Sequence, residues 1–216
     1  MAQEQAQELT GQAASPITLN IRRPEKLSRL HLLLKTFFGW IYVGLPHGII
    51  LYVLSIVAWV VSLAAFVVIL VTGRYPRGLF DFVVGYHRWN LRVAAYAGPF
   101  MGNFMVDKYP PFSFEEEADD SVMLRVEYPE KLSRLHAVLK LLLGWLYVGL
   151  PHGIILLIYG IVLMVALLFA WFIVLFTGRF PGAIFGLAEG YMRWGTRVNL
   201  YLAFARDEYP KFSPSP

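Results

Sequence analysis

One unit of sequence occurs twice in this chain, with an offset of 105 positions. The segment Pro-Glu-Lys-Leu-Ser-Arg-Leu-His starts at Pro24 and again at Pro129, and residues 42–51 are likewise identical to residues 147–156. A period of this length is typical of two whole subdomains and not of a solenoid of short repeats. Whatever one copy folds into, the other is expected to repeat.

Each copy contains a long run without a charged residue. No Asp, Glu, Lys or Arg occurs from Thr36 to Gly73 or from Leu141 to Gly178. A water-facing helix would need a polar stripe through such a run. As one continuous helix, each run would reach roughly 57 Å, against a hydrocarbon core of about 30 Å. The sequence therefore predicts an all-α membrane protein in which each run turns back on itself.

The distribution of basic residues also favours a hairpin. Lysine and arginine lie on both sides of each run, as Lys35 and Arg74 do in the first copy. A single crossing would place comparable positive charge on both sides of the membrane, against the positive-inside tendency. Two hairpins, and so four transmembrane helices in total, predict a multi-pass protein of the cell inner membrane with both termini cytoplasmic. The copies would then be related by a pseudo-twofold axis along the membrane normal.

Two positions are candidates for the hairpin turn. The segment from Gly44 to Gly48, Gly-Leu-Pro-His-Gly, concentrates helix breakers and recurs at 149–153. Alternatively, the proline only kinks the first helix, and the chain turns near Ser55 and near Gly160.

A second helix is expected after each run. The segment Thr-Gly-Arg-Tyr-Pro indicates the end of one helix and the start of another, which predicts helices over about 76–97 and 181–203. These helices are amphipathic and suit the cytoplasmic interface, where arginines contact lipid phosphates or a partner protein. The candidate lipid-headgroup or partner contacts are Arg74, Arg88, Arg92, Arg179, Arg193 and Arg197.

Composition along the chain divides it into five segments. The first is rich in Gln, Ala and Glu and lacks the features of a signal peptide. The predicted segments are a disordered N-terminal tail (1–18), membrane repeat 1 (19–113), an acidic linker (114–123), membrane repeat 2 (124–213) and a C-terminal tail (214–216).

A polar stripe runs along the first helix of each copy at spacings of three and four residues. Polar residues on a membrane helix normally face protein or water and mark functional sites, whereas lysines near a helix end can also extend to the surface. Both interpretations stay open. The candidate stripe residues are Ser28, His31, Lys35, Tyr42, Ser133, His136, Lys140 and Tyr147.

His47 and His152 lie beside the prolines of the repeated Leu-Pro-His segments. Histidine suits metal ligation and proton relay, but it also commonly bonds a carbonyl group. No carboxylate is near either histidine in sequence, so no metal site and no cofactor are predicted.

Catalytic motifs are missing from the sequence. There is no cysteine, nucleophile elbow, phosphate loop or cluster of carboxylates, so no catalytic residue is assigned and the chain is not expected to be an enzyme. The net charge of +4 is explained by a cytoplasmic membrane face, and no nucleic-acid partner is expected.

Several segments occur in a fixed order: Leu-Pro-His, a long apolar run, Thr-Gly-Arg-Tyr-Pro and the closing Tyr-Pro-Pro-Phe-Ser that begins at Tyr109. Together they resemble a bacterial family of membrane domains known only as a domain of unknown function. The resemblance covers both copies, and in the second Met192 replaces His87 and Lys211 replaces Pro111. It implies a membrane location and transfers no catalytic residue.

These observations predict a non-enzymatic integral membrane protein. We expect an accessory or scaffold subunit of a larger membrane complex, or a lipid-organising protein, whose partners are membrane lipids and other membrane subunits or copies of itself. The alternative is a small channel or carrier that acts as an oligomer, with the polar stripes between its repeats.

Overall fold

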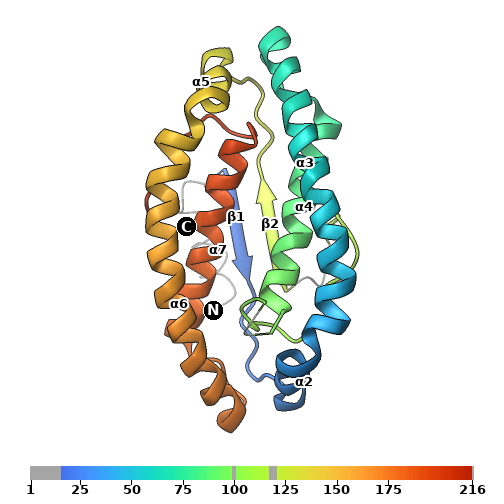
Figure 1. Ribbon diagram of the computed structural model, residues 1–216, viewed down its shortest axis with the longest axis vertical. Helices are drawn as coiled ribbons and strands as arrows, with labels where there is room; N and C mark the ends of the chain where they lie inside the picture. The colour runs from blue at the N-terminus through green and yellow to red at the C-terminus, as the bar shows by residue number, and fades with distance from the viewer. Residues whose placement is uncertain (1–15, 99–100, 117–120, 216) are drawn as a thin grey trace, which may run out of the picture.

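Each repeat folds into one very long helix followed by a shorter helix that packs back on it (Figure 1). The computed structural model describes residues 16–98, 101–116 and 121–215. The helical elements are, in repeat 1, α2 (Arg29–Gly39), the π-helical turn η1 (Trp40–Gly44), α3 (Leu45–Thr72) and α4 (Arg77–Tyr96), and in repeat 2, α5 (Arg134–Gly144), η2 (Trp145–Gly149), α6 (Leu150–Thr177) and α7 (Gly182–Leu202).

The predicted hairpin turns, at Gly44 to Gly48 or near Ser55, are both wrong. Helix continues without a break from Arg29 to Thr72, and from Arg134 to Thr177 in the second repeat. The π-helical turn accommodates the proline: the N–H of Leu45 bonds to the carbonyl of Trp40, and Pro46 follows at the start of α3. In place of four crossings, the described chain has two helices long and apolar enough to cross a membrane.

The predicted end of each long helix and the helix after it are confirmed. Gly73 and Gly178 cap the long helices in the left-handed conformation, with φ of 71° and 70°, which glycine adopts without strain. Pro76 and Pro181 then precede α4 and α7, whose bounds lie within one or two residues of the predicted ones.

A small β-sheet, absent from the all-α prediction, joins the two repeats. Strands β1 (Ile17–Ile21) and β2 (Val122–Val126) pair antiparallel, with Leu19 opposite Leu124. Alternate residues of β1 are buried, as expected of a strand with one face on a core. The sheet takes two residues from the predicted tail and two from the predicted linker, while residues 1–15 and 117–120 lie outside the described residues.

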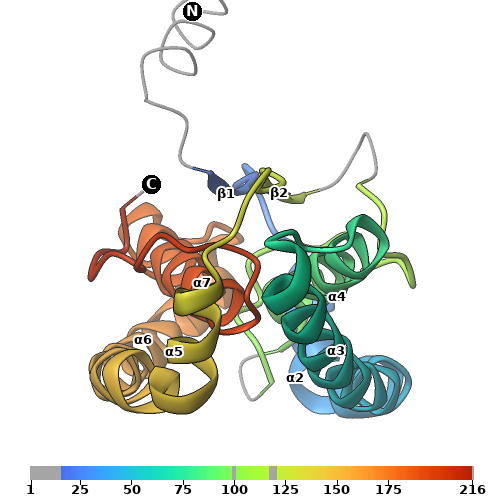
Figure 2. The ribbon, with the colours of Figure 1, turned by 90° about the horizontal axis from the view of Figure 1, so that it is seen from above.

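The strand register shows how the repeats are related. Leu19 and Leu124 are separated by the repeat offset, so a pseudo-twofold axis passes between them, perpendicular to the strands. Figure 1 shows the two long helices running in opposite directions. Figure 2 shows three layers along this axis: the sheet, then α4 and α7, then the long helices.

The repeats interlock into a single body. The end of each long helix contacts the start of the other: Leu27 N–H bonds to the carbonyl of Gly178, and Leu132 N–H to that of Gly73, both at 2.8 Å. The buried core draws residues from both repeats. Neither repeat has a complete core of its own.

Candidate functional site

Two motifs of repeat 1, Leu-Pro-His and Tyr-Pro-Pro-Phe, meet in space. Trp89 Nε1–H donates to Nδ1 of His47 at 2.9 Å, so the proton of the ring lies on Nε2, which is 3.0 Å from the Tyr109 hydroxyl. That hydroxyl donates to the carbonyl of Tyr42 at 3.0 Å. Phe112 stacks on the imidazole, with ring centres 4.0 Å apart.

This cluster compensates for the proline in the long helix. Tyr42 lies four residues before Pro46, which has no N–H to offer its carbonyl. Inside an apolar helix, such a carbonyl needs another donor, and the Tyr109 hydroxyl supplies it. The Tyr-Pro-x-Phe segment therefore holds the π-helical turn in place. The cluster of Tyr109, Phe112, His47 and Trp89 is called the clasp below.

Repeat 2 builds the same clasp with one bond fewer. Trp194 donates to His152 Nδ1 at 2.9 Å, Tyr209 donates to the carbonyl of Tyr147 at 3.0 Å, and Phe212 stacks on the imidazole at 3.9 Å. Within the described part of the chain, His152 Nε2 is buried without a hydrogen-bond partner. The two candidate histidines thus have packing roles, and no group of three metal-ligating side chains forms among the described residues.

Replacing Tyr109 with phenylalanine is expected to lower the free energy of unfolding by about 1–3 kcal/mol, because His47 Nε2–H and the Tyr42 carbonyl both lose their partner. Tyr209→Phe is the matched control and should cost about 1 kcal/mol less, since it breaks one bond. Thermal unfolding in mild detergent measures both, at about 2–4 °C per kcal/mol for a chain of this size. Equal melting temperatures for the two variants would contradict the clasp.

The predicted polar stripe is held by an aspartate that the sequence reasoning missed. Lys35 Nζ lies 2.9 Å from the Asp107 carboxylate, and its side chain is only 1% exposed. The other carboxylate oxygen accepts from the N–H of Ser28 at 2.6 Å, while His31 is exposed, 4.0 Å from the same carboxylate. The lysine therefore neither extends to the surface nor lines an open path.

The stripe continues from the lysine through two tyrosines. Lys35 Nζ lies over the ring of Tyr96, 4.2 Å from its centre, and the Tyr96 hydroxyl is 3.3 Å from that of Tyr42. Burial, with a smaller contribution from Tyr42, raises the pKa of Tyr96 well above its usual value, so the hydroxyl keeps its proton. In this way the stripe residues of repeat 1 form one connected network.

Repeat 2 reproduces this network. Its contacts are Lys140 with Asp207 at 2.8 Å, Ser133 N–H with Asp207 at 2.6 Å, His136 with Asp207 at 4.0 Å, Lys140 over the Tyr201 ring at 4.2 Å and Tyr147 with Tyr201 at 3.0 Å. A signal for these aspartates exists in the sequence: in each copy an Asp stands two residues before the Tyr-Pro.

Four of the six candidate arginines bind the chain's own carbonyl groups. Arg88 donates to Phe114 at 2.6 Å and to Leu124 of strand β2 at 3.2 Å, and Arg193 donates to Leu19 of β1 at 3.2 Å. Arg92 likewise donates to the carbonyl of Ser113 at 3.0 Å, and Arg197 to that of Ser213 at 3.1 Å. These arginines fix the sheet and the closing segment of each repeat onto α4 and α7.

Arg74 and Arg179 differ from the other four. Both are exposed, each just beyond the end of a long helix, and their backbone N–H groups bond to the hydroxyls of Thr72 and Thr177 at 3.1 Å. For these two, contact with lipid headgroups stays a prediction.

The long helices expose a continuous apolar face. Along α2, η1 and α3, large hydrophobic side chains are exposed at spacings of three and four residues. Those that mark one face of this helix are Leu30, Leu34, Phe37, Ile41, Leu45, Ile49, Tyr52, Ile56, Val60, Val67 and Val71. The helix formed by α5, η2 and α6 exposes an equivalent row, including Leu142, Ile154 and Phe176. Figure 2 shows both helices in the layer farthest from the sheet, so this surface is called the apolar face below.

Comparison with known proteins finds one family. The model of a family described as a domain of unknown function, DUF4389, matches residues 34–113 and 139–213. No curated protein matches the chain. No solved structure matches it either.

Proposed function

We propose that this chain, which belongs to the DUF4389 family through both of its repeats, is a non-enzymatic membrane scaffold. It lies in one leaflet and organises lipids or partner subunits around it. The observation that carries this proposal is the apolar face. It extends over two antiparallel helices, while the opposite sides of these helices are covered by α4 and α7.

Helix length favours an in-plane position over a crossing. Each long helix has 44 residues, or roughly 66 Å at 1.5 Å per residue, about twice the hydrocarbon thickness. An interfacial helix has no such limit, because it lies parallel to the surface with its apolar side about 5–10 Å deep.

The position of the charges favours the same orientation. Were the long helices upright, the charged residues of α4 and α7 that lie beside them, such as Arg193 and Glu189, would stand at membrane depth. Charges in the hydrocarbon core are costly. With the apolar face down, the sheet and both of these helices lie above the headgroups on one side of the membrane, and the pseudo-twofold axis coincides with the membrane normal.

A partner subunit would bind the polar side in this arrangement. The described linker residues and strand β1 lie on that side, away from the apolar face. A scaffold needs no reaction chemistry, which agrees with the structural roles of the histidines and of the buried lysines.

The carrier alternative receives less support from the same contacts. A carrier would use Lys35 and Lys140 as free charges for its solute, but both side chains are 1% exposed and bonded to aspartates.

Cysteine labelling tests the proposed orientation, because the native chain has no cysteine. Single cysteines are placed at Lys26 and Arg74, at the two ends of the first long helix, and at Gly48, which is exposed on the helix with open space around its Cα. We expect a membrane-impermeant maleimide to label positions 26 and 74 from the same side of sealed vesicles and position 48 from neither side. Labelling of 26 and 74 from opposite sides, or of 48 from the far side, would overturn the proposal.

A further inference from the structure

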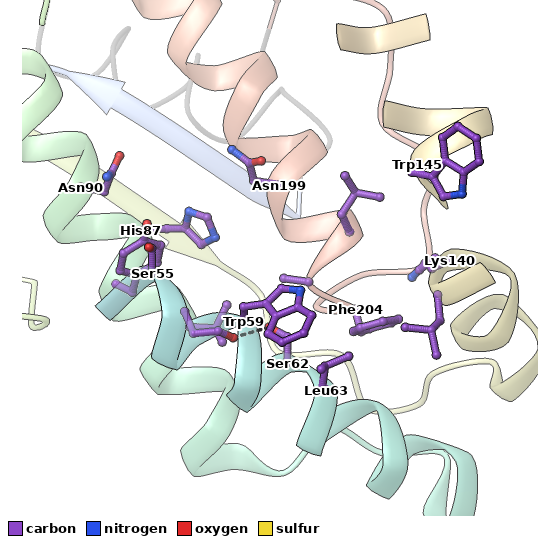
Figure 3. A pocket seen from close by; sticks show the side chains of 16 residues that line it. Ser55, Trp59, Ser62, Leu63, His87, Asn90, Lys140, Trp145, Asn199 and Phe204 are labelled. Carbon is purple, nitrogen blue, oxygen red and sulfur yellow. Dashed lines mark hydrogen bonds between the residues drawn. The ribbon is translucent and has the colours of Figure 1, made fainter. Parts of the chain in front are cut away.

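A cavity of about 480 Å³ lies between the repeats, where α3 and α4 of the first face α5 and α7 of the second (Figure 3). This volume lies in the range of small-molecule sites, about 300–1,000 Å³. The clasps and the lysine–aspartate pairs described above leave this space open.

The cavity wall is polar on one part and aromatic on another. Figure 3 shows His87 and Asn90 of α4 and Asn199 of α7 on its polar part, and Trp59 of α3 and Trp145 of η2 on its aromatic part. Trp59 and Trp145 are 65% and 66% exposed, and they belong to the two long helices that carry the apolar face. The cavity therefore opens toward the proposed lipid side.

The polar groups of the wall carry little net charge. Lys140 is the one described lysine or arginine in the lining, and its ammonium is paired with Asp207 at 2.8 Å. Burial lowers the pKa of His87 to about 4, which leaves the imidazole neutral at physiological pH, and burial raises the pKa of Tyr86. An ionic head group would find no free opposite charge among these side chains.

Donors and acceptors are nevertheless plentiful. The Asn90 and Asn199 amides and the His87 ring offer both. Ser62 donates its hydroxyl proton to the carbonyl of Ala58 at 2.8 Å, so its oxygen can still accept. Such a set matches a ligand that bears several hydroxyl groups.

The polar residues of the wall occur at only one of the two places that the pseudo-twofold axis relates. At the repeat offset, His87 is matched by Met192, Asn90 by Gly195, Asn199 by Ala94, Ser55 by Gly160 and Ser62 by Leu167. Each of these five polar residues thus stands where the other copy has an apolar residue or glycine, whereas Lys140 and Tyr86 match Lys35 and Tyr191. Symmetric packing of the repeats does not require these polar residues.

We infer that this cavity binds an uncharged amphiphile with a hydroxyl-bearing head group, such as a monoacylglycerol or a glycosylated lipid. The head group bonds to His87, Asn90 and Asn199, and the acyl chain leaves between Trp59 and Trp145 along the apolar face. This inference rests on the proposed function, which places that face in lipid.

The test uses 1-monooleoylglycerol carrying a photoreactive group in its chain, added to the full-length protein in detergent micelles. After irradiation, mass spectrometry of peptides is expected to place the adducts on α3 and α5 beside the cavity. Excess unlabelled monooleoylglycerol should remove them, whereas oleate and oleoyl-lysophosphatidate, with the same chain and a charged head, should compete at least tenfold less well. Free glycerol should not compete, because it lacks the acyl chain. If the charged lipids compete as strongly as monooleoylglycerol does, the inference is overturned.

Variants that exchange residues between the copies test the polar wall. His87→Met with Asn199→Ala installs residues that this fold already carries at the equivalent positions, and we expect binding about tenfold weaker. Tyr52→Leu, the same kind of exchange at a position on the apolar face outside the cavity, is the matched control and should bind as the wild type does. Unchanged binding in the double variant would overturn the inference.

Flotation of the same proteins with liposomes separates the two proposals. Proteins that float but show no cavity adduct overturn this inference and leave the proposed function standing. If the protein gives cavity adducts in micelles but does not float with liposomes, the proposed function is wrong. Ligand binding in the cavity then still stands.

Discussion

Replacing Asp107 with alanine is expected to lower the free energy of unfolding by about 3–5 kcal/mol, because it leaves the Lys35 ammonium buried without its counter-charge. The lysine side chain is 1% exposed, and the helix around it offers no other carboxylate in its described contacts. The substitution also removes the acceptor of the Ser28 N–H at the start of α2. Thermal unfolding in mild detergent, followed by intrinsic fluorescence, measures the loss.

A double variant tells whether the loss comes from the uncompensated charge. Adding Lys35→Met to Asp107→Ala removes the stranded ammonium, so the double variant should be more stable than Asp107→Ala alone. Asp207→Ala in the second repeat should reproduce the effect of Asp107→Ala, since the two networks share their geometry. If the double variant is no more stable than Asp107→Ala, the loss does not come from the uncompensated charge of Lys35.

Two acidic residues on the apolar face should release the protein from membranes. Ile49 and Ile56 are 61% and 50% exposed on that face, and the substitutions Ile49→Glu and Ile56→Glu together should weaken liposome binding by a hundredfold or more. This follows from a cost of about 2 kcal/mol for each charge taken into the hydrocarbon boundary. Flotation of the protein with liposomes after removal of detergent measures the change.

The matched control adds the same charge to the other side of the molecule. Thr18 and Asn20 are exposed on strand β1, in the layer farthest from the apolar face, so Thr18→Glu with Asn20→Glu should float as the wild type does. Equal flotation of the two double variants would mean that the face bearing Ile49 and Ile56 does not meet the lipid.

Features set by local chemistry could be predicted from the sequence. The stop at Gly73 needs only a residue that tolerates a positive φ, and the start of α4 needs only a proline before its first turn. The amphipathic character of α4 and α7 follows from spacing within one helix. The repeat offset also predicted that the helices of one copy would return in the other, as they do.

The features that the sequence analysis missed depend on contacts between distant residues. Whether Pro46 ends a helix depends on the π-helical turn before it and on the hydroxyl of Tyr109 that bonds to the Tyr42 carbonyl. The charge argument for hairpins assumed that an apolar run must cross the membrane, which an in-plane helix need not do. Strand β1 is five residues long, and its partner is β2 of the other repeat.

The candidate site could be predicted only in part, because some of its contacts join residues that are far apart in the sequence. The stripe residues Lys35 and Tyr42 belong to one network, as their helical spacing indicated. Asp107, which holds the lysine, follows a loop after α4, and no pattern within the stripe points to it. Arg88 and Arg92 were expected to face lipid or a partner, but carbonyl groups of the closing segment lie within their reach.

The depth of the first long helix in a bilayer tests the central claim most directly. Spin labels are attached to single cysteines at Phe37, Ile49, Ile56 and Val67, which are exposed on the apolar face from the start of the helix to near its end. Their accessibility to oxygen and to a water-soluble nickel complex gives the depth of each label. We expect all four labels at one similar, shallow depth, about 5–10 Å below the headgroup boundary. A depth that changes along the helix across the full bilayer thickness would contradict the in-plane scaffold.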